Sequence, residues 1–278
     1  MRLVIQGSAI SYSHLSHIHQ LCETSVQFTQ IAQHAYYLAN QTISPELQQF
    51  CANQKIDCAY VQDKQLIDKF GLCVMDMDST LISIECIDEI ADMVNIKPQV
   101  AAITERAMQG ELDFAQSLRE RVALLKGLNE SDLMRVLNER LTLNPGAKEW
   151  IDTCKKNNIT TLLVSGGFNF FADRVKAMLG LDYAVANSLE IIDGKLTGKV
   201  LGDIVDAQTK ADELVKLRDQ LGLTAAQTIA IGDGANDLKM MSVAGAGVAY
   251  HAKPVVQAQA TYALNHSGLD GVTNLFTA

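Results

Sequence analysis

Long apolar segments are missing from this chain of 278 residues. None reaches the roughly 18 consecutive apolar residues that a membrane-spanning helix needs. The first twenty residues also lack the charged start, the long apolar run and the small-residue cleavage site of a signal peptide. We therefore expect a cytoplasmic protein without a membrane partner.

Clusters of lysine and arginine are missing as well. The chain has 23 Lys and Arg against 32 Asp and Glu, which gives a net charge of -9. A surface that coats nucleic acid or a polybasic membrane anchor needs the opposite balance, so we expect no nucleic-acid partner. Taken alone, the net charge also predicts no anionic ligand, whereas the positions of individual charged residues predict that one binds.

Paired cysteine motifs are the third absence. The six cysteines contain no CxxC pair, which argues against a zinc framework or a redox motif and favours reduced structural thiols. His14, His17 and His19 lie close together, but no carboxylate or further cysteine completes a metal-binding set there.

Apolar residues, by contrast, are plentiful, at 48% of the chain against 20% charged residues, so a folded protein of about two domains is expected. In residues 1–68, strand-like and helix-like segments alternate in the order β-α-β-α-β. They are RLVIQGS, HLSHIHQLCET, HAYYLAN, SPELQQFCANQ and CAYVQ. This pattern predicts a small N-terminal α+β domain.

Residues 69–278 have a different texture. Short apolar runs that end in small or acidic residues alternate with helix-like segments, which indicates a parallel sheet covered on both faces. The runs are LCVMDMD, TTLLVSGG, TIAIGDG and GAGVAY. In such sheets the ligand crevice lies beyond the carboxyl ends of the strands. A helical insertion at about 87–141 interrupts the alternation, and we expect it to act as a cap over the crevice.

The strongest chemical signal is the pair of carboxylates at the end of the first run, Asp76 and Asp78. Two carboxylates so close repel each other unless a cation or a shared proton relieves them. Mg²⁺ prefers one or two carboxylates together with phosphate oxygens and waters. Asp233, in the later sequence GDGAND, supplies another hard oxygen ligand, and Asp237 is expected to act directly or from behind it.

These residue types fit phosphoryl transfer. An aspartate such as Asp76 can attack phosphorus, while Asp78 can protonate the leaving alkoxide and later deprotonate a water. The charged phosphoryl group needs positive or N–H donors, which Ser165, Gly166 and Lys210 can provide. Taken alone, a lysine at position 210 would more often be a solvated surface residue.

Together and in order, DMDST, VSGG, the Lys210 region and GDGAND closely resemble the haloacid-dehalogenase-like phosphohydrolases. The resemblance covers residues 72–278 and implies a Rossmann-like core with a helical cap and bound Mg²⁺. It implies that Asp76 is the nucleophile and Asp78 the general acid and base. It also implies that Asp76, the Asp78 carbonyl and Asp233 bind the metal, and that the phosphate is bound by Ser165, Gly166, Lys210 and Asn236. The N-terminal part is similar, diffusely, to small ACT-like regulatory domains.

The cap residues suggest the substrate. Glu85 can accept an α-ammonium group, and Arg121, which the resemblance favours over Arg119, can hold a carboxylate through two hydrogen bonds. Met108 and Phe114 resemble apolar positions that close over a bound substrate, although packing within the cap explains them equally well. Without the resemblance, Arg121 would read as one of several solvent-facing helix charges.

The expected activity is therefore Mg²⁺-dependent hydrolysis of O-phospho-L-serine to L-serine and phosphate, the last step of serine biosynthesis. Two alternatives stay open at this point. One is transfer of the phosphoryl group to another alcohol, and the other is a non-catalytic amino-acid-binding regulatory protein. The sequence leaves the oligomeric state open, with a homodimer among the expected forms.

Overall fold

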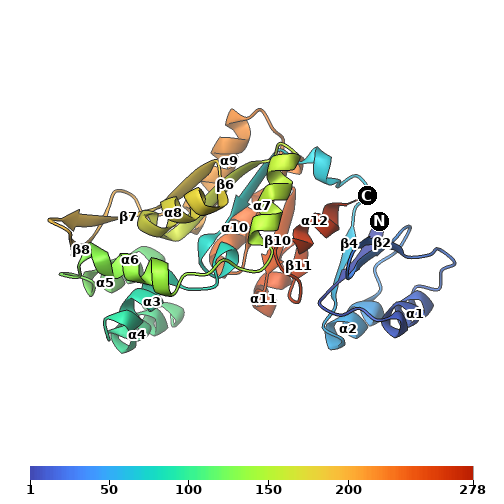
Figure 1. Ribbon diagram of the computed structural model, residues 1–278, viewed down its shortest axis with the longest axis horizontal. Helices are drawn as coiled ribbons and strands as arrows, with labels where there is room; N and C mark the ends of the chain where they lie inside the picture. Colours follow the sequence, from blue (N-terminus) through green and yellow to red (C-terminus); the bar gives the residue numbers. More distant parts are fainter. Residues whose placement is uncertain (278) are drawn as a thin grey trace.

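The computed structural model describes residues 1–277, which form two β-sheets flanked by helices (Figure 1). The larger sheet has seven strands in the order β11-β10-β9-β5-β6-β7-β8, and every neighbouring pair except β7 and β8 is parallel. The strands are β5 (Leu72–Met75), β6 (Thr160–Phe168), β7 (Tyr183–Ile192), β8 (Lys195–Leu201), β9 (Thr228–Gly232), β10 (Ala246–Tyr250) and β11 (Tyr262–Leu264). The predicted α/β class with a Rossmann-like parallel core is confirmed.

Helices cover both faces of this sheet, as the apolar runs predicted. Alternate residues of β5 belong to different hydrophobic clusters, with Cys73 and Met75 in one and Leu72 and Val74 in the other. The first cluster includes side chains of α7 (Ala147–Lys156), α8 (Asn169–Leu179) and α12 (Gly271–Phe276). The second includes side chains of α9 (Ala207–Gln220), α10 (Leu238–Val243) and α11 (Pro254–Gln257). A strand buried on both faces explains why its residues are continuously apolar.

The hairpin formed by β7 and β8 was not predicted. Its strands are antiparallel, and Asp193 and Gly194 form the turn with φ angles of 50° and 72°. Asp-Gly is the sequence signal for such a two-residue turn, so this hairpin was detectable from the sequence. The hairpin reaches the cap, where the Leu196 carbonyl accepts a hydrogen bond from the Gly127 N–H at 2.8 Å.

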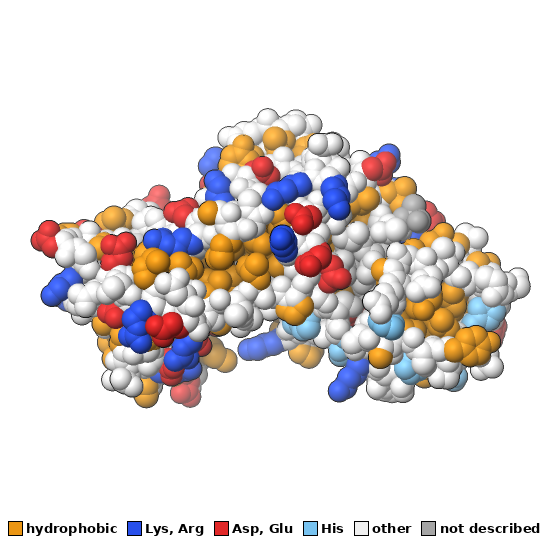
Figure 2. Space-filling model, viewed as in Figure 1, with side chains coloured by type: hydrophobic (Ala, Val, Ile, Leu, Met, Phe, Trp, Pro, Cys, Tyr) orange, Lys and Arg blue, Asp and Glu red, His pale blue; other side chains and the backbone are white. Residues whose placement is uncertain are grey.

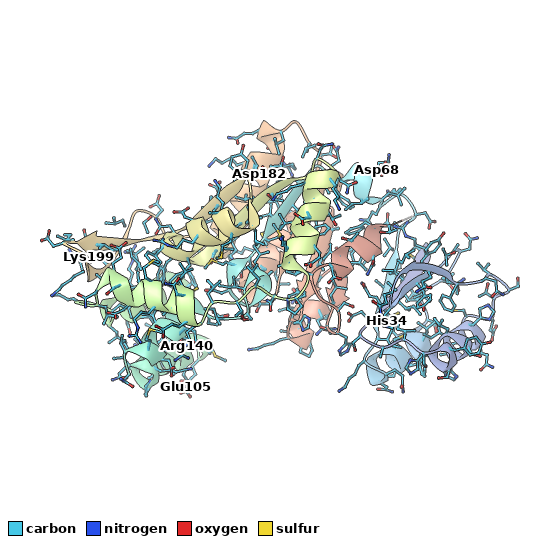
Figure 3. The ribbon with its side chains drawn as sticks, viewed as in Figure 1. His34, Asp68, Glu105, Arg140, Asp182 and Lys199 are labelled. Carbon is cyan, nitrogen blue, oxygen red and sulfur yellow. The ribbon has the colours of Figure 1, made fainter. Side chains whose placement is uncertain are left out.

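Between β5 and α7 the chain forms the helical cap, which projects from the core (Figure 1). The short helix η2 (Met77–Leu81) leads into α3 (Cys86–Met93), α4 (Lys97–Met108), α5 (Phe114–Ala123) and α6 (Glu130–Glu139). Arg140, labelled in Figure 3, follows α6 directly. It pairs with Glu89 at 3.1 Å and Asp92 at 3.5 Å, which ties the end of α6 to α3.

The N-terminal segment forms the smaller sheet, in the order β2-β3-β1-β4 with all pairs antiparallel. Its elements are β1 (Arg2–Gln6), α1 (Tyr12–Leu21), β2 (Thr29–Ala32), β3 (Ala35–Leu38), α2 (Pro45–Asn53) and β4 (Asp57–Val61). This βαββαβ order is ferredoxin-like. The sequence reading missed β2, because this mostly exposed edge strand lacks the apolar alternation that marks a half-buried strand.

The central strand β1 of the smaller sheet is buried on both faces. Leu3 and Ile5 pack against the N-terminal helices, whereas Val4, Ala59 and Val61 join the large cluster of the core. The sheet lies on the side of the core where α12 is found (Figure 1). On the face drawn in Figure 2, basic and acidic side chains are interspersed over the core and cap, and no extended patch of one sign forms.

The sequence predicted no membrane-spanning helix, and it predicted reduced cysteine thiols. No helix in residues 1–277 combines the length and apolar character needed to cross a membrane. All six cysteines are free, and four of them are buried.

Candidate active site

A cavity of about 480 Å³ lies between the cap and the carboxyl ends of β5, β6 and β9. All of the predicted site residues except Lys210 and Asp237 line it. The predicted residues that line it are Asp76, Asp78, Glu85, Met108, Phe114, Arg121, Ser165, Gly166, Asp233 and Asn236. Residues from distant parts of the sequence therefore meet at one crevice.

Lys210 lies beneath the cavity and holds Asp76. Its Nζ is 2.7 Å from Asp76 Oδ1 and 2.7 Å from Asp237 Oδ1, and the lysine is 1% exposed. Burial alone would lower the pKa of Lys210, but the two carboxylates outweigh it and raise that pKa above its ordinary value. The lysine is a permanent cation, and its removal would leave two buried carboxylates without their partner.

The Asp76 side chain is oriented through one of its two oxygens. Oδ1 accepts hydrogen bonds from Lys210 Nζ and from the Met77 N–H at 2.8 Å. Met77 itself is fully buried and belongs to the same core cluster as Cys73 and Met75. Oδ2 is thereby left as the oxygen of Asp76 that can be directed at a ligand.

Asp78 has the environment of a protonated carboxyl group. Its Oδ1 is buried and has no hydrogen-bond partner among the residues that the structure describes. Burial, followed by the nearby Glu85, raises the pKa of Asp78 well above its ordinary value. A carboxyl group whose pKa is raised in this way keeps its proton to higher pH than an exposed aspartic acid and can act as a proton donor.

Three carboxylates, those of Asp76, Asp233 and Asp237, place an oxygen each within 4.8 Å of one another. Burial raises the pKa of Asp233 to about 6 and that of Asp237 to about 7. Clustered carboxylates that resist ionisation fit a divalent cation such as Mg²⁺, which binds hard oxygen ligands. Asp237 is already occupied by Lys210 and by the Gly234 N–H at 3.0 Å, so Asp76 and Asp233 are the freer ligands.

Near the end of β6 the regular pairing with β7 is interrupted between Val164 and Phe168. The Ser165 hydroxyl accepts a hydrogen bond from the Gly167 N–H at 2.8 Å, and Asn187 Nδ2 donates to the Gly166 carbonyl at 2.8 Å. A Cβ on Gly167 would lie 3.1 Å from Asp78 Oδ2. A side chain at this position would therefore crowd the Asp78 carboxyl, which glycine avoids.

The cap supplies the opposite wall. Glu85 Oε1 accepts a hydrogen bond from the Ser79 hydroxyl at 2.7 Å. Arg121 Nε donates to the Ser117 carbonyl at 3.3 Å, which leaves the terminal nitrogens of the guanidinium for a ligand. Phe114 comes close to the core, since a Cβ on Gly166 would lie 2.9 Å from its ring.

Several lining residues were not predicted. Sequence reasoning missed eight residues in the wall of the cavity, which are Ile87, Thr104, Ala107, Leu112, Ser117, Leu118, Gly167 and Phe168. The second glycine of VSGG was a usable signal for Gly167. Most of the others occupy ordinary positions of cap helices, while Leu112 lies in the loop between α4 and α5. Nothing in their residue type distinguishes a cavity-facing position from a packed one.

A family model described as haloacid dehalogenase-like hydrolase matches residues 73–242. The chain belongs to this family. The match includes β5, the cap and the strands that end at the cavity. The sequence prediction of this hydrolase family is confirmed.

Relatives within the family extend the likeness over almost the whole chain. The phosphoserine phosphatase of Haemophilus influenzae is 45% identical over 99% of this chain and 88% of its own. The solved structure of a probable phosphoserine phosphatase from Vibrio cholerae, unliganded, has a TM-score of 0.89 at 42% identity, covering 99% of this chain and 86% of that one. A hydrolase of the same family from Salmonella enterica serovar Typhi has a TM-score of 0.91 at 32% identity, covering 99% and 97%.

Proposed function

We propose that this protein is a Mg²⁺-dependent phosphoserine phosphatase, which hydrolyses O-phospho-L-serine to L-serine and phosphate. The proposal rests on one observation, which is that two chemically different sets of residues, one from the core and one from the cap, line the same cavity. Asp76 and the partnerless Asp78 carboxyl form the core wall, and Glu85 and Arg121 form the cap wall. The named relatives support the same activity.

In the first step, Asp76 Oδ2 attacks phosphorus, and the bond between phosphorus and the serine oxygen breaks. Asp78 gives its proton to the departing alkoxide, so L-serine leaves neutral at that oxygen. Lys210 keeps Oδ1 in place during the attack through the 2.7 Å contact. The product on the enzyme is an aspartyl-phosphate.

In the second step, a water attacks the phosphorus of the aspartyl-phosphate. Asp78, now ionised, takes a proton from that water, and the bond between phosphorus and Asp76 breaks to release inorganic phosphate. Asp78 is thereby protonated again for the next turnover. The departing and arriving oxygens occupy the same position, so one carboxyl group serves both.

Charge on the transferring group needs donors on several sides. Asp76, Asp233 and the carbonyl of Asp78 would hold Mg²⁺, which when bound neutralises phosphate charge as a Lewis acid. Ser165, the Gly166 N–H and Asn236 surround the remaining oxygens. Their positions at the cavity wall support this assignment.

The cap would recognise the amino-acid head group. Glu85 accepts hydrogen bonds from the α-ammonium, and Arg121 donates two to the α-carboxylate. Met108 and Phe114 would cover the bound substrate. The division at residues 68 and 69, the bounds of the cap at 87 and 141 and the ACT-like regulatory role of the first domain stay predictions, as do a cytoplasmic location and a homodimer.

Phosphate release from a panel of phosphomonoesters, with Mg²⁺ and with a chelator, tests the proposal. We expect O-phospho-L-serine to be the best substrate and the chelator to abolish release. Absence of release from every phospho-amino acid would contradict the proposal and favour a regulatory binding protein. A new phosphorylated alcohol, formed when candidate acceptors such as homoserine are added, would instead favour phosphoryl transfer.

A further inference from the structure

A buried carboxylate of the N-terminal sheet contacts a loop of the core. Asp57, the first residue of β4, is 5% exposed. It accepts hydrogen bonds from three consecutive backbone N–H groups of the loop between β11 and α12. The donors are Asn265 at 2.7 Å, His266 at 3.1 Å and 3.2 Å, and Ser267 at 2.9 Å. Successive N–H groups around one anion fix the loop to the N-terminal sheet.

The same loop contacts the returning linker of the cap. The Leu269 N–H donates to the Pro145 carbonyl at 2.8 Å. The two segments are in close contact, because a Cβ on Gly268 would lie 2.7 Å from the Pro145 carbonyl oxygen. These two contacts couple the position of the loop to that of the linker.

Asn144, next to Pro145, fastens the two cap linkers to each other. Its Nδ2 donates to the Thr80 carbonyl at 2.8 Å and to the Ile82 carbonyl at 3.1 Å, and its N–H donates to the Leu81 carbonyl at 2.9 Å. The Thr80 hydroxyl in turn donates to Asp233 Oδ1 at 3.1 Å. The path thus ends at the cavity.

We propose that Asp57 is a positioning residue for the cap. Through the 265–269 loop and Asn144, the N-terminal sheet holds both linkers of the cap in register with the catalytic loop. The N-terminal domain then contributes to turnover without touching the substrate. The inference depends on the proposed function only for its kinetic readout.

The test compares Asp57→Asn with Arg2→Met in the full chain. The asparagine directs an NH₂ group at backbone donors, so the loop loses part of its anchor. Arg2 also joins the N-terminal sheet to the core, through the Leu275 carbonyl at 3.1 Å, but it lies off the path. It is a matched control for general loosening of the interface.

Hydrogen exchange is measured at the amides of Ser83 and Asn144, which bond across the linkers to the Thr142 and Leu81 carbonyls at 2.9 Å each. We expect Asp57→Asn to accelerate both by roughly 3-fold to 30-fold, and to raise KM for phosphoserine more than it lowers kcat. Arg2→Met should leave both amides unchanged. Equal acceleration in the two variants, or none in Asp57→Asn, overturns the proposal, and neither result depends on which substrate the enzyme uses.

Gly268→Ala provides a second variant that keeps Asp57 intact and pushes the loop away from Pro145. On a shared path, combining it with Asp57→Asn should add little to the exchange rates of the linkers. Strictly additive effects would show two independent routes and contradict the proposal.

Discussion

At the core end of the cavity the functional side chains are buried and held by short ionic contacts, whereas at the cap end they are more exposed and held by few bonds. Lys210 is 1% exposed and Asp237 0%, against 37% for Phe114 and 77% for Met108. Preorganised charges at the core suit a step in which bonds to phosphorus break. Looser side chains on the cap suit a surface that admits a substrate and closes on it. The comparison predicts that core substitutions reduce kcat and cap substitutions raise KM.

The largest effect is expected at the nucleophile. Asp76→Asn removes the attacking carboxylate while keeping its shape, so kcat should fall by roughly 10³-fold or more. Steady-state phosphate release measures this, and trapping of the aspartyl-phosphate should fail in the variant. An Asp76→Asn enzyme with normal turnover would show that the core end has another nucleophile.

Removal of the buried cation should affect folding as well as rate. Lys210→Met leaves the Asp76 and Asp237 carboxylates without their common partner, which should cost about 3–5 kcal/mol of unfolding free energy. Urea unfolding of the metal-free protein measures it. Lys216→Met, on the exposed part of the same helix, is the control and should change stability by less than about 1 kcal/mol.

At the cap end, Arg121→Ala should impair recognition more than chemistry. Loss of a bidentate charged contact corresponds to roughly 10-fold to 100-fold in KM for phosphoserine. Phosphoethanolamine lacks the carboxylate, so its kcat/KM should change little. Arg119→Ala, the exposed neighbour, is the matched control. Equal losses on both substrates would remove the assigned role of Arg121 and blur the contrast between the two walls.

Binding of Mg²⁺ should stabilise the fold more at high pH than at low pH. Asp233 and Asp237 have folded pKa values of about 6 and about 7, above the ordinary 3.8, so the folded state binds more protons across that interval. Stability of the metal-free protein therefore falls as the pH rises through these values. Protons also compete with the cation for Asp233. The increase in Tm with Mg²⁺ should be larger at about pH 8 than at about pH 5. Calorimetry with Mg²⁺ and with a chelator at each pH measures this increase, and a larger increase at the lower pH would contradict the prediction.

The smallest effect is expected at Met108. Its side chain is mostly exposed, so Met108→Ala should change kcat/KM by no more than a few-fold and leave the unfolding free energy within about 0.5 kcal/mol. A large loss of stability would indicate that packing within the cap, and not the cavity, explains this residue.

The site residues that the strand pattern itself predicted lie at the ends of apolar strands, whereas the roles of Lys210 and of the cap residues depended on the family resemblance. Asp76, Ser165 and Asp233 follow that strand pattern, and the parallel sheet brings them together. Asn144 does not, because its importance depends on contacts with Thr80 and Ile82, more than sixty residues earlier. Local pattern cannot reveal such a contact. The Asp193-Gly194 turn is different, since its signal was present in the sequence and was overlooked.

The hairpin of β7 and β8 adds a third attachment to a cap that the chain itself joins only twice. Backbone hydrogen bonds link Leu196 with both Gly127 and Leu128, and Gly194 with Glu130. A cap attached by two linkers and a hairpin cannot rotate about an axis through the two linkers unless the hairpin bends. Any movement of the cap about its two linkers would therefore require the β7–β8 hairpin to bend with it or to release these hydrogen bonds.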